Sequence, residues 1–582
     1  MILALIFILP LIAALACLTL SRVVPTRWLG IGAAAALLIG GAALLFWKLR
    51  AGLPLAIVDL AWIAIDNRPI HVSLLFDTLS WAPALLALFG GGIALLTLAL
   101  VVPLNLRGFG GLFAAAQLAI LATIAGLANQ NLLLLPFAWS LVALLTFIAL
   151  RASGALTGSE APVIVLLAGL SGALIVLSAA LLTSPSAPDA APTRIGLICW
   201  TLLGLLALGA PPFQAPLQRL AEAPAALSGM LMTLGLPLLG GVALIRFLDG
   251  SAASLPNSWR LILTGLGFLT LLVCAAGATG TTQLRRLLSW QFSAQMGLLL
   301  MALAQGGAAL AVAAPALLAN AVLSTLVCYL AVAVLERRAG TDDLAGITLR
   351  EPLVWPGALF LVGAASAIGL PGFWGLWPRR WLLDELANVT PWAIAPLLAG
   401  STLLALGFLP ALAIFWRRTG ASPIEEYVAP RRERPTAAVL VGAIGAMPLL
   451  IFGIAPQIAW NGWLSGAPGA TAAPRLPGGL AQAICAAAAL LLVSTPAVLL
   501  LSRRSAAAAQ AESSGVVAPT ALGESLEWLA WPGTATAAFA SLWQGLLRGS
   551  QLLWRGLLLF EQRYYLAGLL IAVIVVIMLF LQ

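Results

Sequence analysis

Long apolar runs separated by short polar segments dominate the chain. A helix needs roughly 20 apolar residues to cross a hydrocarbon core about 30 Å thick. About sixteen runs approach or reach that length, near residues 2–21, 29–48, 80–102, 111–128, 131–150, 162–183, 195–210, 226–247, 258–278, 287–304, 308–335, 353–370, 392–416, 436–457, 479–502 and 564–581. The pattern predicts an all-α polytopic membrane protein with about sixteen transmembrane helices and no inserted soluble domain.

Two of these runs end at similar proline breaks. The first break, at 209–213, contains Pro211 and Pro212, and the second, at 369–373, contains Pro371. Proline removes a backbone donor and clashes with the preceding turn. Inside a bilayer, the freed backbone groups must face protein or a water-filled cavity. The breaks predict two discontinuous helices in inverted repeats, and two ordinary proline kinks are the alternative.

The composition changes towards the C-terminus. Residues 505–523 form a connector rich in Ala, Ser, Gln and Gly. Tryptophan and leucine then recur at broadly helical spacing, which predicts an amphipathic lateral segment before a last transmembrane helix. The predicted units are N-terminal helices 1–105, a first repeat 106–250, a second repeat 251–420, C-terminal helices 421–502, the connector and lateral segment 503–563, and the last helix 564–582.

Composition supports the membrane assignment. Apolar residues make up 62% of the chain, charged residues 8%, and the mean hydropathy is +1.07, which excludes a soluble protein. The first run follows no basic residue and precedes no small-residue cleavage site, so we expect a retained helix. The five cysteines are scattered singly, without a CxxC motif, so we expect no iron–sulfur or zinc site in the chain.

The basic residues are distributed unevenly between the two sides of the predicted helices. The net charge is +9, and 20 of the 29 basic residues fall in alternate loops on one side, against seven on the other. The positive-inside rule places the first side in the cytoplasm and both termini on the outer side. Topology therefore explains the positive charge, and we expect the lipid bilayer as a partner and not nucleic acid.

Several motifs occur in an order typical of one family. Residues 283–297 read QLRRLLSWQFSAQMG. This segment resembles the D-[IL]-K-R-x-L-A-Y-S-x-x-S-Q-x-G signature of the antiporter-like subunits of respiratory complex I, Mrp-type cation/proton antiporters and membrane-bound hydrogenases. Residues 75–80, 131–139, 212–228 and 369–371 resemble further motifs of that family. The resemblance extends from about residue 70 to 460, and the final helix after a connector resembles the L-type subunit.

The resemblance implies a non-catalytic membrane-arm subunit of a complex-I-type NADH:quinone oxidoreductase, in the inner membrane of a bacterium. It implies other membrane and peripheral subunits as partners, and these would carry flavin, iron–sulfur clusters and quinone. Three alternatives stay open: an active cation/proton antiporter subunit of an Mrp-type or hydrogenase-type complex, a membrane anchor of another module, and a stand-alone permease.

The positions that carry protons in the family are substituted here. A glutamate of the fifth helix corresponds to Ser140, and a lysine of the seventh to Ala207. A histidine and a lysine of the eleventh correspond to Asn320 and Ser324, and a lysine after the second break to Arg379. Serine, alanine and asparagine do not titrate, and arginine stays protonated. We therefore predict that this chain's own proton path is lost and that its role is structural.

Two charge pairs are candidates in the broken helices. Arg219 and Glu222 are three residues apart, so they would be neighbours on a helix, with a solvated loop pair as the alternative. Arg379 and Asp384 could form a buried pair, with an ordinary interfacial arginine as the alternative.

Three other charged or titratable residues receive simpler interpretations. Arg285 and Arg286 are expected to anchor the cytoplasmic end of a helix at the headgroups, with functional charges that face the bundle as the alternative. The single histidine, His71, is expected in a loop between the second and third helices.

Overall fold

The computed structural model describes residues 2–464, apart from 66–67, 103–107, 155, 157–158, 184–193, 252–255, 307–308, 345–346, 348–352 and 417–435. The predicted fifteenth helix, connector, lateral segment and last helix lie outside the described residues.

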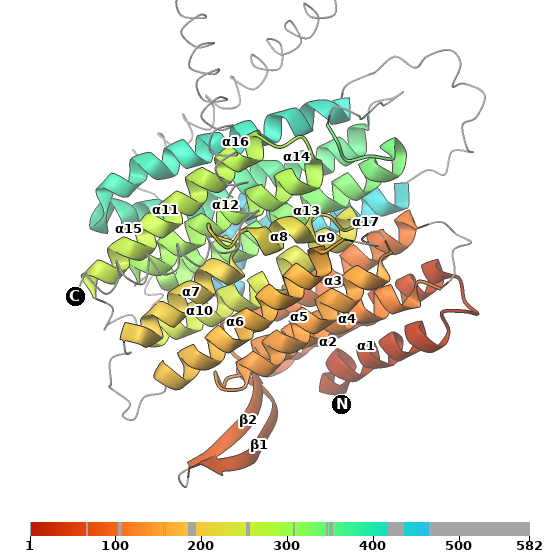
Figure 1. Ribbon diagram of the computed structural model, residues 1–582, viewed down its shortest axis with the longest axis horizontal. Coiled ribbons are helices and arrows are strands. Elements are labelled where there is room, and N and C mark those ends of the chain that lie inside the picture. The colour runs from red at the N-terminus through yellow and green to blue at the C-terminus, as the bar shows by residue number, and fades with distance from the viewer. Residues whose placement is uncertain are drawn as a thin grey trace, which may run out of the picture.

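The described chain is mostly helical (Figure 1). Its first half contains α1 Ile2–Thr19, α2 Thr26–Ala51, β1 Leu55–Ile65, β2 Arg68–Phe76, α3 Trp81–Val101, α4 Gly110–Ala128, α5 Leu135–Ala152, α6 Ala161–Thr183, α7 Arg194–Ala207, α8 Ala215–Leu220, α9 Ala225–Leu234 and α10 Leu236–Ser251. Its second half contains α11 Asn257–Thr279, α12 Leu284–Gln305, the π-helix η2 Ala309–Ala313, α13 Ala314–Ala339, α14 Val354–Ile368, α15 Leu376–Val389, the 3-10 helix η3 Pro391–Ala393, α16 Ile394–Trp416, α17 Thr436–Ile454 and α18 Pro456–Gly462.

The helices match the predicted apolar runs. Within the described residues, 11 helices are long and apolar enough to cross a membrane, and three shorter apolar helices accompany them. These fourteen helices fall on the fourteen runs predicted before residue 464. They lie side by side in one bundle, with α1 and α16 at opposite edges in Figure 1. A polytopic helical membrane fold is therefore confirmed for this part of the chain.

The prediction of an all-α fold is wrong between α2 and α3. Strands β1 and β2 pair antiparallel, from Leu55 opposite Phe76 to Ile65 opposite Arg68, and the hairpin projects from the bundle (Figure 1). The expected loop position of His71 is corrected too, because this residue lies in β2 opposite Ala61. The segment is rich in β-branched residues around Asp66 and Asn67, a composition typical of a hairpin.

The helices α12 and α13 occupy the centre of the bundle. Every residue in the apolar window of α12 is buried, whereas only 28% of the window of α17 is buried. Apolar burial does not drive helices together in lipid, so close packing between small residues becomes important. A Cβ on Gly297 of α12 would come within 2.6 Å of the carbonyl oxygen of Gly267 on α11. These two glycines therefore allow α11 and α12 to touch along their backbones.

Both predicted breaks interrupt helices. Pro211 and Pro212 lie in the segment between α7 and α8, and Pro371 lies between α14 and α15. Gly209 and Gly369 open the two breaks with φ angles of +62° and +86°, in the left-handed region that favours glycine. The relation of the two breaks as inverted repeats stays a prediction.

Candidate functional site

Five polar side chains form a buried network beside the second break, which we call the polar centre: Gln295, Asn320, Ser324, Thr325 and Ser366. The hydroxyl of Ser366 donates to Asn320 Oδ1 at 2.7 Å, and Asn320 Nδ2 lies 3.5 Å from Gln295 Oε1. Ser324 Oγ donates to the same Gln295 oxygen at 3.2 Å, and Gln295 Nε2 donates to Thr325 at 3.3 Å. Three helices, α12, α13 and α14, thus contribute to one network.

The polar centre also stabilises the break. The backbone N–H of Gly375 donates to Ser366 Oγ at 3.1 Å, and Asn320 Nδ2 donates to the Ser366 carbonyl at 3.3 Å. A break in a membrane helix leaves backbone groups that need partners, and the hydroxyl and amide supply them. The structure therefore brings the predicted positions Asn320 and Ser324 together. Sequence reasoning did not identify Ser366, although a serine close to a break in an otherwise apolar run is a detectable signal.

Arg379 lies in α15, directly after the same break, and is only 6% exposed. Its Nη1 donates to Ser401 Oγ at 2.9 Å, and its Nη2 donates to the carbonyl of Ala367. Among the described residues, no carboxylate lies within ion-pair distance of this guanidinium. A permanent cation therefore sits inside the bundle with neutral oxygens as its hydrogen-bond partners.

The predicted pair of Arg379 and Asp384 does not form. Asp384 Oδ2 instead lies 3.4 Å from Nε of Arg380, four residues earlier on α15. Residues four apart share one face of a helix, whereas residues five apart diverge by about 140°. Helix periodicity therefore assigns Asp384 to Arg380 and leaves Arg379 on another face.

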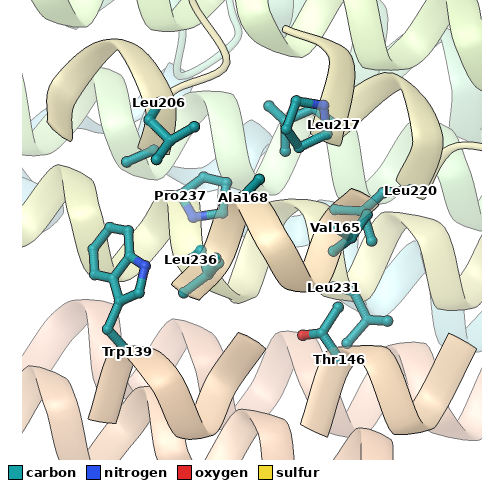
Figure 2. Close-up of a pocket in the computed structure, with 13 residues that line it drawn as sticks. Trp139, Thr146, Val165, Ala168, Leu206, Leu217, Leu220, Leu231, Leu236 and Pro237 are labelled. Atoms are coloured by element: carbon teal, nitrogen blue, oxygen red, sulfur yellow. The ribbon is translucent and has the colours of Figure 1, made fainter. Parts of the chain in front are cut away.

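Ser140 and Ala207 have no part in the hydrogen bonds of the polar centre. The Ser140 hydroxyl donates to the carbonyl of Pro136 at 2.8 Å, within its own helix α5. Ala207 is the last residue of α7 and lines a cavity of about 40 Å³ together with Trp139 and Leu217. Figure 2 shows Trp139, Leu217 and other mostly apolar side chains around this space. The cavity beside α7 and α8 is thus lined mostly by apolar side chains, whereas the second break has a polar network.

The predicted pair of Arg219 and Glu222 forms at the turn after α8. Arg219 Nη1 lies 2.8 Å from Glu222 Oε1, and Arg286 Nη2 approaches the same oxygen at 3.5 Å. The hydroxyl of Ser159 donates to the second carboxylate oxygen at 3.2 Å. Glu222 therefore joins the turn between α5 and α6 to the start of α12.

Arg285 joins three further segments at the same end of the bundle. Its Nε lies 3.0 Å from Glu336 Oε1 on α13 and 2.9 Å from Asp342 Oδ2 in the following loop. Its Nη1 donates to the carbonyls of Glu222 and Ala223 at 3.1 and 2.6 Å. Both arginines lie at the start of α12 and contact carboxylates within the protein, and their contact with headgroups stays a prediction.

A second charged network includes Arg246 of α10. It lies at the opposite end of the membrane-spanning segment Ala225–Leu248 from the network around Glu222. Arg246 Nη2 lies 3.1 Å from Asp77 Oδ2, and its Nη1 donates to the Asn129 carbonyl at 2.8 Å. Asp77 also accepts hydrogen bonds from the backbone N–H of Ser80 at 2.7 Å and from Gln130. Burial would raise the pKa of Asp77, but the Arg246 charge and the hydrogen bonds outweigh it and hold the pKa below its ordinary value. Sequence reasoning did not identify this network.

The described residues contain no group of three or more His, Cys, Asp or Glu side chains that could hold a metal ion. The four cysteines in this part of the chain, Cys17, Cys199, Cys274 and Cys328, are free. At the polar centre itself, the described side chains are amides and hydroxyls that offer hydrogen bonding.

Comparison with known proteins identifies relatives of this chain. The profile of the family described as NADH:quinone oxidoreductase/Mrp antiporter, TM, matches residues 128–405. NADH-quinone oxidoreductase subunit N of Xanthomonas euvesicatoria pv. vesicatoria (strain 85-10) is 27% identical over 261 residues, which cover 44% of this chain and 52% of that relative. The chain spans about half the length of the curated relatives it matches first.

Solved structures share the fold. A chain of the Mrp complex from Dietzia sp. DQ12-45-1b gives a TM-score of 0.68 at 20% identity, covering 93% of this chain and 63% of that chain. A chain of respiratory complex I from Thermus thermophilus with bound NADH gives 0.64 at 19% identity, covering 84% and 100%. At these identities the likeness concerns the fold alone. Together with the apolar helices, the family match over residues 128–405 supports an integral membrane protein related to the antiporter-like subunits of complex I and Mrp complexes.

Proposed function

We propose that the chain is a membrane-arm subunit of a complex-I-type NADH:quinone oxidoreductase, and that its own polar centre does not carry protons. The composition of the polar centre supports this most directly. Its members are two amides and three hydroxyls, joined side chain to side chain beside a permanently charged arginine.

A buried proton relay needs groups that gain and lose a proton within the working pH range. Amides and serine hydroxyls donate and accept hydrogen bonds but do not titrate in that range. Each member of the polar centre already bonds to another member. The network therefore holds α12, α13 and α14 together and lacks the chemistry of a relay.

Arg379 adds an electrostatic barrier. A fixed positive charge inside a pore repels protons and other cations, and an arginine does not lose its charge at any working pH. This guanidinium lies beside the break of the second discontinuous helix, where backbone would otherwise be open to water. We propose that it seals this route.

The charged networks at the two ends of the bundle fit an architectural role. Glu222 and Arg285 join loops and helices at one end, and Asp77 and Arg246 do so at the other. In this proposal the partners are further membrane and peripheral subunits, which hold the flavin, iron–sulfur clusters and quinone. The assembly lies in the bacterial inner membrane, with both termini of this chain on the outer side.

The first experiment identifies the assembly. The protein is isolated in a mild detergent, and the chains that accompany it are identified by mass spectrometry. Flavin and iron–sulfur subunits of an NADH dehydrogenase support the proposal. Mrp-type chains alone contradict it and favour a cation/proton antiporter subunit, the function that the shared fold with the Mrp complex makes the second candidate.

The second experiment tests proton conduction in the reconstituted complex. Ser324→Ala removes a hydroxyl of the polar centre with little change in volume, and we expect an unchanged number of protons per NADH. A lower number in fully assembled complexes contradicts the proposal.

Passive proton leak tests the barrier. Arg379→Gln is expected to raise the leak of proteoliposomes, whereas Arg380→Gln, which removes the adjacent and equally buried charge, is expected to leave it unchanged. Equal leaks in the two variants contradict the role of Arg379.

A further inference from the structure

A large cavity of about 430 Å³ is lined by residues of α2, α3, α10, α13, α17 and α18, and by Leu79, Trp374 and Trp463 outside these helices. We call it the lateral cavity. Its lining consists of apolar, aromatic, glycine and proline residues with one exception, Lys48. An apolar cavity of this kind excludes water, so its natural contents are apolar.

The lateral cavity opens towards the membrane. Ile444 on α17 and Ile458 on α18 both line it, and they remain 58% and 54% exposed. Along α13 the lining extends from Pro315 to Leu330, fifteen residues apart, which corresponds to about 22 Å of helix. One leaflet of the hydrocarbon core is about 15 Å deep. The cavity is therefore deep enough for an acyl chain that enters from one leaflet.

Lys48 is the only lysine of the chain and lies at the edge of the lateral cavity. Its Nζ donates to the carbonyl of Gly462 at 2.8 Å and lies 4.4 Å from the centre of the Trp81 ring. No carboxylate among the described residues lies within ion-pair distance of it. An ammonium has three donors, so Lys48 keeps donors for an anionic group.

We propose that the lateral cavity binds one anionic phospholipid, with an acyl chain among the apolar side chains and the phosphate at Lys48. The positive charge of Lys48 determines which lipid headgroup the cavity favours. A single cation at the rim of an otherwise apolar cavity favours a net negative lipid over a zwitterionic one. Trp81 and Trp463 at the same rim suit the interface, where aromatic rings with a polar edge gather. The inference does not depend on the proposed role in proton transfer.

Native mass spectrometry of the full-length protein with its native partners tests this proposal. The protein is loaded from nanodiscs of phosphatidylglycerol and phosphatidylcholine in a fixed ratio. Wild type is expected to retain phosphatidylglycerol preferentially. Lys48→Met keeps the apolar stem and is expected to weaken that retention about fivefold. The matched control is Arg50→Met, which removes a cation of the same helix outside the cavity lining and is expected to retain lipid like wild type.

Unchanged retention in Lys48→Met, or equal retention of the two lipids by wild type, overturns the proposal. Leu323→Trp fills the cavity and is expected to release the lipid whatever its headgroup.

Photo-crosslinking gives a reading that does not depend on the folding of a cavity-filling variant. A benzoylphenylalanine at Ile458 is expected to form an adduct with phospholipid. An adduct with a quinone, with a partner chain, or with this chain's own residues 465–582 overturns the proposal.

Discussion

Replacing Arg285 by methionine removes the guanidinium that joins the start of α12 to Glu336 and Asp342. Breaking a buried ion pair by removing one partner costs about 3–5 kcal/mol. The side chains of Glu336 and Asp342 keep 20% and 14% exposure, so water compensates part of the loss. The carbonyls of Glu222 and Ala223 also lose their donor. We expect the free energy of unfolding to fall by about 3 kcal/mol, at the lower end of that range.

Reversible unfolding in mixed micelles, titrated with dodecyl sulfate and followed by tryptophan fluorescence, measures this change. Arg338→Met is the matched control, because this exposed arginine lies near the end of α13, and the expected change is within about 0.5 kcal/mol. Adding Glu336→Gln to Arg285→Met should recover part of the loss, since the unpaired charge disappears. Equal losses in Arg285→Met and Arg338→Met would refute the reasoning.

Three further predictions concern the break and the opposite end of the bundle. Gly375→Ala places a Cβ against the Ser366 carbonyl, so the yield of folded protein, measured by size-exclusion chromatography, should fall sharply. The control Gly265→Ala has open space around the new Cβ and should fold normally. Ser366→Ala removes the hydroxyl that donates to Asn320 Oδ1 and accepts from the Gly375 N–H. Thermal unfolding should show a fall of about 1–3 kcal/mol in the free energy of unfolding, and an unchanged value would contradict the network. The lowered pKa of Asp77 means that its stabilisation is complete above the ordinary aspartate pKa of about 3.9 and is lost as the pH falls through the lowered value. Melting curves from pH 3 to 7 should therefore show a steeper acid loss in wild type than in Asp77→Asn, and parallel curves would contradict the pairing.

The helix breaks show how much local sequence can predict. Pro211 and Pro371 lie in the segments that separate two helices, because proline and glycine act on the backbone within one turn. The ion pair of Arg219 and Glu222 was also predictable, since three residues on a helix bring side chains together. Arg380 and Asp384 obey the same rule, so periodicity alone would have favoured this pair over Arg379 and Asp384.

Contacts between distant segments could not be predicted in this way. Asn320 and Ser366 are 46 residues apart, and Arg285 and Asp342 are 57 apart. Their partners depend on which helices and loops pack together, and a list of apolar runs does not contain that information. The carboxylates around Arg285 were missed for this reason, because they come from the end of α13 and the loop that follows it.

The sequence by itself determined that this chain is a bundle of membrane helices with two breaks. A bilayer leaves unpaired backbone groups no partners, so apolar runs of sufficient length must become helices. The tertiary structure decided which polar side chains meet. It placed an amide and hydroxyl network at the second break and a mostly apolar cavity beside α7 and α8, and it left Lys48 beside a deep apolar cavity. Those arrangements depend on helix rotation and packing, which are set by contacts between segments far apart in the chain.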